Sequence, residues 1–370
     1  MRKEFNNMKE SKYGGIQLLR FLSFLCVIVF HSSVLHSINE VFPLGVLVEV
    51  AMTFFFIVSG FLYGTRVQNF PNKIQAEDIV IFLKKKIKKV YPLYFLVMLL
   101  ALPLTNLFST SEWAEKAYII KHFIINTFLM QSWFPNNYAL CGHTWFLSSL
   151  FFLYVITVPL AVALKRLQSR FGNKSLLLIW GAMILFSYIW NKGVLGIGLP
   201  PERYIYILPV SRIPEYVCGM VAGIYWEMFE GAITKHRKKW LTWSIAEVAI
   251  LIVIVLLCIK GVSYWRGQSY VWILPVTTLI GIFTIGGGAI SRIGNCGLVN
   301  ILGNISYECY IIHQLPVAYF VTVSQPEDTI IKTVLLLYII VIDVLIAYLI
   351  YLLRNSCSKQ DKNIKNTQIK

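Results

Sequence analysis

An arginine and a histidine, Arg20 and His31, lie eleven residues apart in the first apolar segment of the chain. At about 100° per residue, eleven residues turn a helix to within about 20° of three full turns, so both side chains share one face, about 16 Å apart along the axis. Ionisable residues inside a membrane helix are costly and indicate a functional site. A histidine there can act as a general base toward a hydroxyl group. The alternative is a hydrogen-bonded packing residue.

A run of five lysines precedes the third apolar segment, at positions 84, 85, 86, 88 and 89. Lysine ammonium groups hold phosphates as point charges. Lys85, Lys86 and Lys89 are therefore candidates for binding a polyanionic ligand on the cytoplasmic side. As an alternative, the lysines would only anchor the loop on that side of the membrane.

Two later segments also carry histidine close to other polar or aromatic groups. His143 and Trp145 stand at the start of the fourth apolar segment, where they would contact substrate or form part of an interfacial aromatic belt. Glu308 and His313 place ionisable groups inside the ninth segment, as site residues or as packed polar groups.

Arg212 and Glu215 are three residues apart, close enough to pair on one helix face. A charge inside a membrane needs such a partner. A structural ion pair is the simpler interpretation, and a contribution to the substrate site is the alternative.

The composition predicts that these residues are positioned by membrane helices. Hydrophobic residues make up 57% of the 370 residues and the mean hydropathy is +0.64. Each long apolar run approaches the ~20 residues that cross a bilayer. We predict an all-α, polytopic membrane protein with ten spans, at residues 16–35, 44–64, 90–108, 144–164, 176–193, 209–228, 241–260, 270–287, 299–321 and 329–353. Segment 117–131 is interrupted by Lys121, His122 and Asn126, which favours an interfacial or re-entrant helix.

The distribution of basic residues tests this topology. With both termini in the cytoplasm, 25 of the 34 lysines and arginines fall in cytoplasmic segments, six fall outside and three lie within spans. This asymmetry follows the positive-inside rule. It also explains the net charge of +16 without nucleic-acid binding, because basic segments meet the anionic inner leaflet.

The remaining patterns are uninformative about chemistry. The seven cysteines form no CxxC pair and most lie in apolar segments, as small buried residues do. The first apolar run is too long for a cleaved signal peptide and contains Arg20. Nothing predicts a metal site or a permanently bound cofactor. Residues 1–354 are expected to form one transmembrane domain, and residues 355–370 a short, polar, disordered cytoplasmic tail.

Taken together, these motifs and their order resemble the membrane-bound acyltransferase family 3. Its members share the arginine and histidine of the first span and a Phe-Phe-x-x-Ser-Gly-Phe element, here at residues 55–61. A basic element matches residues 86–92, with lysines replacing both arginines, and further elements match residues 143–147, 212–219 and 306–313. The last of these adds Tyr307 to the candidate residues. The resemblance extends over about residues 14 to 350.

Membership would imply a ten-span enzyme that moves an acyl group, usually acetyl from acetyl-CoA, onto sugars or small molecules at the bacterial envelope. It would imply His31 as the catalytic residue, with Arg20, and the basic element as the coenzyme A contact. Leu150 stands where many members that act on long polysaccharides have glutamate, so the chain looks more like the branch with capsular and small acceptors.

The sequence therefore favours an integral-membrane O-acetyltransferase in the bacterial inner membrane. Its partners would be acetyl-CoA, a surface glycan or lipid-linked sugar precursor, and membrane lipids. The alternative is a transporter of a glycan or small carboxylate, since paired charges within ten helices suit that role as well.

Overall fold

The computed structural model describes residues 13–32, 44–105, 110–134, 140, 142–323 and 328–368. All regular elements in these ranges are helices, which confirms the all-α prediction. The longer helices are α2 (Gly14–His31), α3 (Leu44–Gly64), α4 (Ala76–Ala101), α5 (Trp113–Thr127), α6 (Trp145–Phe171), α7 (Lys174–Gly196), α8 (Ile213–Thr234), α9 (Trp240–Ile259), α10 (Ser269–Ile285), α12 (Gly297–Ile312), α13 (Gln314–Val323) and α14 (Thr329–Gln368).

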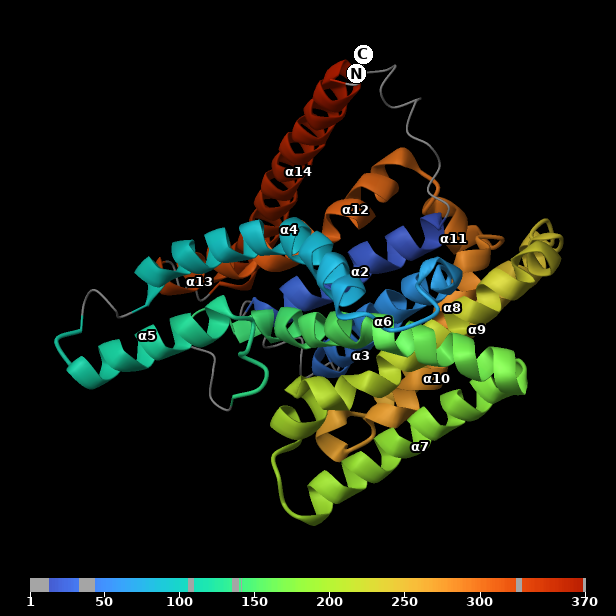
Figure 1. Ribbon diagram of the computed structural model, residues 1–370. Coiled ribbons are helices and arrows are strands. Elements are labelled where there is room, and N and C mark those ends of the chain that lie inside the picture. The colour runs from blue at the N-terminus through green and yellow to red at the C-terminus, as the bar shows by residue number, and fades with distance from the viewer. Residues whose placement is uncertain are drawn as a thin grey trace.

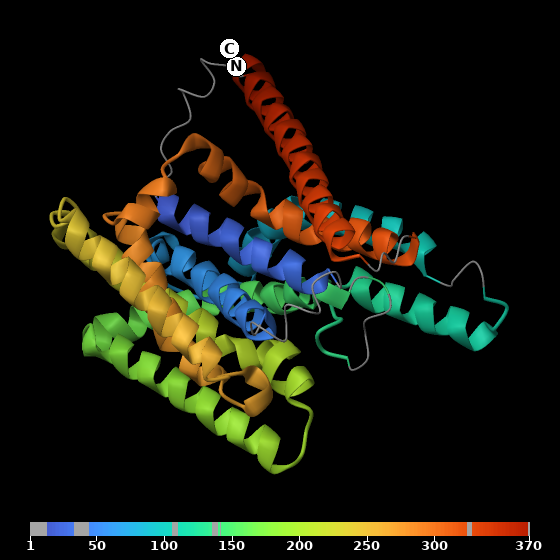
Figure 2. The same cartoon turned by 180° about the vertical axis from the view of Figure 1, so that it is seen from behind.

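Short helices complete the chain between these elements. They are η2 (Val67–Asn69), η3 (Leu102–Leu104), η4 (Gly142–Thr144), η5 (Glu202–Ile207), η6 (Pro209–Arg212), η7 (Tyr264–Arg266) and α11 (Ala289–Ile293). Figure 1 shows most of the helices gathered in one bundle, with α5 and α14 projecting away from it, and Figure 2 shows the same arrangement from behind.

Within the described residues, seven helices are long and apolar enough to cross a membrane, and α10 is a shorter apolar helix of 17 residues. The chain is therefore a multi-pass membrane protein. The predicted count of ten spans and the cytoplasmic placement of both termini stay predictions. The 15-residue helix α5 covers most of segment 117–131 and is shorter than a spanning helix needs to be.

Two elements differ from the sequence-based expectation. The predicted span 299–321 is divided at His313 into α12 and α13, because Pro316 has no N–H to donate to the carbonyl of Ile312. The polar segment that begins at Asn355 was expected to be disordered, but α14 continues through it to Gln368. No proline or glycine interrupts that segment, so no backbone break ends the helix there.

The closest helix packing in the bundle joins α3 to α8. A Cβ atom added at Gly60 would lie 2.0 Å from the carbonyl oxygen of Tyr216, and one added at Gly219 would lie 2.1 Å from that of Ile57. Gly64 and Gly223, four residues further along each helix, are equally close to the opposite backbone. This pairing of two Gly-x-x-x-Gly patterns lets the backbones touch, as in membrane helix dimers.

The basic loops gather at one end of the bundle. Lys165 Nζ donates to the carbonyl of Phe70 (2.8 Å), which joins the C-terminal part of α6 to the segment after α3. Tyr225 OH donates to the carbonyl of Asn173 (2.6 Å), and Arg237 Nε donates to that of Gly286 (3.2 Å). The segments predicted to be cytoplasmic therefore lie together. Helix α2 begins at this basic end, where Gly14 contacts Gly294, and runs away from it toward His31.

Candidate active site

Three histidines from distant parts of the sequence meet at the end of the bundle opposite the basic loops. The ring centroids of His31 and His313 are 5.2 Å apart, those of His143 and His313 are 4.7 Å apart, and those of His31 and His143 are 6.4 Å apart. His143 and His313 are buried, whereas His31 is partly exposed. Each residue is a predicted site residue, but no sequence pattern indicates that they form one cluster.

Helix ends place all three rings. His31 is the last residue of α2, His313 lies in the break between α12 and α13, and His143 lies in η4 directly before α6. Helices α2 and α12 pack side by side, with Gln17 bonded to Asn304 at one end and the ring of Phe24 against His313 nearer the other. The parallel course of these two helices brings their terminal histidines together.

Each of the three rings lies within hydrogen-bonding distance of a backbone carbonyl. The Nδ1 atom of His31 is 2.9 Å from the carbonyl oxygen of Val27 and 3.3 Å from Nε2 of His313. The Nδ1 atom of His313 is 2.7 Å from the carbonyl oxygen of Tyr310, and Nε2 of His143 is 3.2 Å from that of Ile311. The cluster is therefore a connected, orientated set of imidazole groups.

A cavity of about 440 Å³ occupies the other half of the same helices, toward the basic end. Five cationic side chains line it, and Glu308 is the one carboxylate among the described residues that do so. The five are Arg20, Arg66, Lys86, Lys89 and Arg354. Such an excess of positive charge suits a ligand with several negative charges.

The lining changes character along the cavity. On α3 and just beyond it, Phe55, Ser59, Leu62 and Arg66 follow one helical face, and they span about 16 Å at 1.5 Å per residue. Arg66 is at the basic end and Phe55 is at the histidine end, where its ring packs on that of Tyr310. The cavity thus suits a long ligand with an anionic head among the cations and an uncharged tail directed toward the histidines.

Tyr310 is the boundary between the cavity and the histidine cluster. It lines the cavity, its hydroxyl donates to the carbonyl of His143 (2.5 Å), and its own carbonyl is bonded by His313. None of the three histidines lines the cavity itself. The two regions are therefore adjacent and share this one residue as their common wall.

The structure distinguishes among the three candidate lysines. Lys86 and Lys89 line the cavity, whereas Lys85, on the same helix, is exposed and does not. The ammonium of Lys86 lies 4.9 Å from the ring centroid of Tyr63 and 5.7 Å from that of Tyr154, so cation–π contacts hold it at the wall. A lysine at this position is thus oriented by aromatic rings, although it lacks the planar fork of arginine.

Several residues of the cavity were not among the sequence candidates. Arg66 follows the periodic positions of α3 and could have been found from them. Arg354 comes from α14 and forms an ion pair with Glu308, whose side chain is only 2% exposed. No spacing rule predicts that pair, because 46 residues separate the partners. Tyr307 was a candidate, and it lines the cavity while its hydroxyl donates to the carbonyl of Val90 (3.3 Å).

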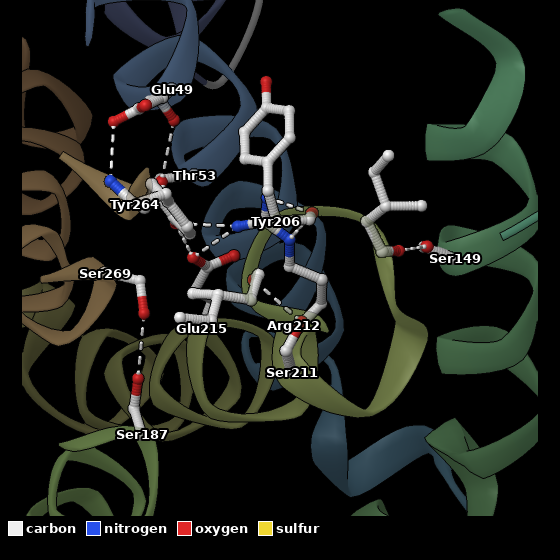
Figure 3. A network of polar contacts seen from close by, with 12 residues as sticks. Glu49, Thr53, Ser149, Ser187, Tyr206, Ser211, Arg212, Glu215, Tyr264 and Ser269 are labelled. Carbon is white, nitrogen blue, oxygen red and sulfur yellow. Dashed lines mark hydrogen bonds and ion pairs between the residues drawn. The ribbon is translucent and has the colours of Figure 1, made fainter. Parts of the chain in front are cut away.

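Arg212 and Glu215 form the predicted pair, with 2.9 Å between Nη1 of the arginine and Oε1 of the glutamate. Figure 3 shows the network that surrounds them. Arg212 also donates to the carbonyl of Tyr206 and to the hydroxyl of Tyr264, and Thr53 bonds the same hydroxyl at 2.6 Å. Both charged side chains are buried.

This network supports the histidine cluster indirectly. The guanidinium of Arg212 lies 5.5 Å from the ring centroid of Trp145, two residues after His143. Trp145 is buried and packs on Tyr206, with 4.9 Å between ring centroids. Trp145, Arg212 and Glu215 therefore lie in the packed wall beside the cluster and do not line the cavity.

The chemistry available here is proton transfer beside a cation-lined cavity. Neutral imidazole can remove a proton from a hydroxyl group and return it to a leaving group. Within the described residues no group of three or more histidine, cysteine or carboxylate side chains could hold a metal ion.

The comparison with protein families agrees with transfer chemistry: residues 13–353 match the model of an acyltransferase domain. No match to the chain was found among curated proteins or among solved structures. A match over nearly the whole described chain means that this membrane protein belongs to the acyltransferase 3 family.

Proposed function

We propose that the chain is an O-acetyltransferase that takes acetyl from acetyl-CoA and transfers it to a hydroxyl group of a surface or capsular polysaccharide, or of its lipid-linked precursor. The observation that carries this proposal is the cavity, whose five cations face one carboxylate and whose apolar end adjoins the histidines. The phosphates of coenzyme A would bind the cations, and the pantetheine arm would extend toward Tyr310.

The sidedness follows from the same arrangement. Coenzyme A is cytoplasmic, so the cation-lined end would face the cytoplasm of a bacterial inner membrane. His31 lies about 16 Å further along α2 than Arg20. We expect the acceptor hydroxyl to approach from the opposite side and to meet the thioester beside His31.

His31 would act as the general base in this reaction. The acceptor hydroxyl would give its proton to His31 while its oxygen attacks the thioester carbonyl, and the proton would then pass to the departing thiolate of coenzyme A. The same residue could serve a relayed transfer, in which acetyl is carried before it reaches the acceptor.

We expect His31→Ala to insert and fold normally but to lose acetyl transfer, by about 10²- to 10⁴-fold, because general-base catalysis contributes that much. The measurement uses proteoliposomes supplied with radiolabelled acetyl-CoA and alkali-treated surface polysaccharide as the acceptor probe. His236→Ala is the matched control, since His236 lies beyond the basic end of α8 and outside the cavity.

Two outcomes would contradict the proposal. Full transfer by the His31→Ala protein would exclude His31 as the base. Movement of polysaccharide across the proteoliposome membrane, with no label transferred by the wild-type protein, would favour the transporter alternative, because a transporter needs no thioester donor.

A further inference from the structure

The hydrogen bonds of the histidine cluster determine which ring nitrogens carry protons. A carbonyl oxygen only accepts hydrogen bonds. Because Nδ1 of His31 lies 2.9 Å from the carbonyl of Val27, that nitrogen carries a hydrogen. By the same reasoning, Nδ1 of His313 carries the hydrogen that it donates to the carbonyl of Tyr310 at 2.7 Å.

Only one donor and acceptor assignment of the hydrogen bond between the His31 and His313 rings is consistent with these protons. A neutral His313 with its hydrogen on Nδ1 has a lone pair on Nε2, and this atom lies 3.3 Å from Nδ1 of His31. His31 therefore shares its Nδ1–H between Val27 and His313. The reverse direction would need a doubly protonated His313. That ring is fully buried beside two other imidazoles, where an unpaired cation is costly.

The remaining nitrogen of His31, Nε2, is then left without a hydrogen. It is the atom that can accept a proton from a substrate hydroxyl. The carbonyl of Val27 alone would hold the ring weakly, because a carbonyl four residues back is also the normal acceptor for the backbone N–H of His31.

We propose that His313 is a positioning residue that holds His31 in the tautomer and orientation in which Nε2 is the proton acceptor. The inference rests on the proposed function, in which His31 is the base. As the acceptor oxygen bonds to the thioester carbon and the carbon–sulfur bond breaks, Nε2 of His31 takes the hydroxyl proton and then gives it to the thiolate. While the His31 ring holds this proton it is positively charged, and the lone pair on Nε2 of His313 faces it.

The test compares two substitutions of similar size. Leucine at position 313 can neither accept from His31 nor donate to Tyr310, whereas the amide of glutamine can do both. We expect His313→Leu to lower kcat by about tenfold to a hundredfold, less than loss of the base itself, with the KM for acetyl-CoA within about twofold of wild type. His313→Gln should retain most of the wild-type kcat.

Phe24→Leu is the packing control, since the Phe24 ring contacts His313 edge to face, with 6.3 Å between ring centroids, and the structure shows no hydrogen bond between them. Its kcat should stay close to that of the wild type. A kcat loss as large as that of His313→Leu would mean that packing around His313, and not its hydrogen bonds, supports the reaction. Equal losses in His313→Gln and His313→Leu would carry the same meaning.

Nitrogen NMR of ¹⁵N-histidine-labelled protein gives a readout that a merely structural role would not move. The His31 signals are identified by their absence from the His31→Ala spectrum. The wild type should show His31 with a protonated Nδ1 and a bare Nε2, and His313→Leu should show a mixture of tautomers. A wild-type His31 protonated on Nε2 would overturn the inference. This result comes from the wild-type spectrum, so it stands even if the His313 variants fail to fold. Activity in His31→Ala would instead refute the proposed function.

Discussion

Arg20 and Arg212 both lie within the helix bundle, yet their surroundings differ. Arg212 is completely buried, and its guanidinium bonds to Glu215, to the Tyr264 hydroxyl and to the Tyr206 carbonyl. Arg20 donates to Gln17 at 3.2 Å, and its side chain lines a cavity shared with four other cations. All three guanidinium nitrogens of Arg212 are hydrogen-bonded to protein groups, whereas Arg20 lines a space that a ligand can fill.

This contrast separates two uses of charge inside a membrane protein. A buried arginine whose hydrogen-bonding groups are engaged by protein mainly maintains the structure, since removing it would leave its carboxylate partner uncompensated. Cations around a cavity repel one another, and a ligand with several negative charges would relieve that repulsion. The Arg212 network and the cation-lined cavity should therefore respond to mutation in opposite ways.

The largest effect is expected from Arg212→Met. Breaking one partner of a buried ion pair leaves Glu215 unpaired and should lower the free energy of unfolding by about 3–5 kcal/mol. The measurement is thermal unfolding in detergent, together with the yield of folded protein. Adding Glu215→Leu should restore much of the loss, because both charges are then absent. Normal unfolding with lost coenzyme A binding would instead place Arg212 in the ligand site.

A smaller and different effect is expected from the double variant Lys86→Ala and Lys89→Ala. Hydrogen bonds to charged groups contribute about 1.5–3 kcal/mol each, so loss of both lysines should raise the Kd for coenzyme A by at least about a hundredfold while the thermal unfolding changes little. Titration calorimetry with coenzyme A would measure this. Lys85→Ala is the matched control, because Lys85 lies on α4 but does not line the cavity. If the control and the double variant change the Kd equally, the lysines only anchor the loop on one side of the membrane.

The smallest effect is expected from Glu308→Gln. Glu308 pairs with Arg354 at the cavity and would compete with ligand phosphates for that arginine. Since Arg354 is partly exposed, the pair contributes little, and its loss should tighten coenzyme A binding by about two- to fivefold. Weaker binding in Glu308→Gln would show that the carboxylate positions Arg354 for the ligand and does not compete with it.

Local periodicity explains what could be predicted. The spacing of Arg20 and His31 predicted a shared helix face. Arg20 lines the cavity together with Glu308 of α12, and the ring of His31 contacts His313, directly after α12. The three-residue spacing of Arg212 and Glu215 predicted their ion pair, which is present. Both inferences hold because the rotation per residue within a helix is fixed.

Contacts between helices were less accessible to such reasoning. The Gly-x-x-x-Gly patterns at residues 60–64 and 219–223 are visible in the sequence, but their direct apposition depends on how α3 and α8 pack. Likewise, the break at His313 could have been inferred from Pro316, whereas the ion pair of Glu308 with Arg354 could not. The crossing and register of two helices depend on side chains from both.

The sequence by itself determined that this protein is helical and membrane-embedded, that its basic loops are segregated, and which polar residues share a face of one helix. Only the tertiary structure decided that His31, His143 and His313 meet, and that Arg66 and Arg354 join the lysines around one cavity. The reason is physical: helical rotation and hydrophobicity are properties of a local segment, whereas a site between helices depends on which faces pack together.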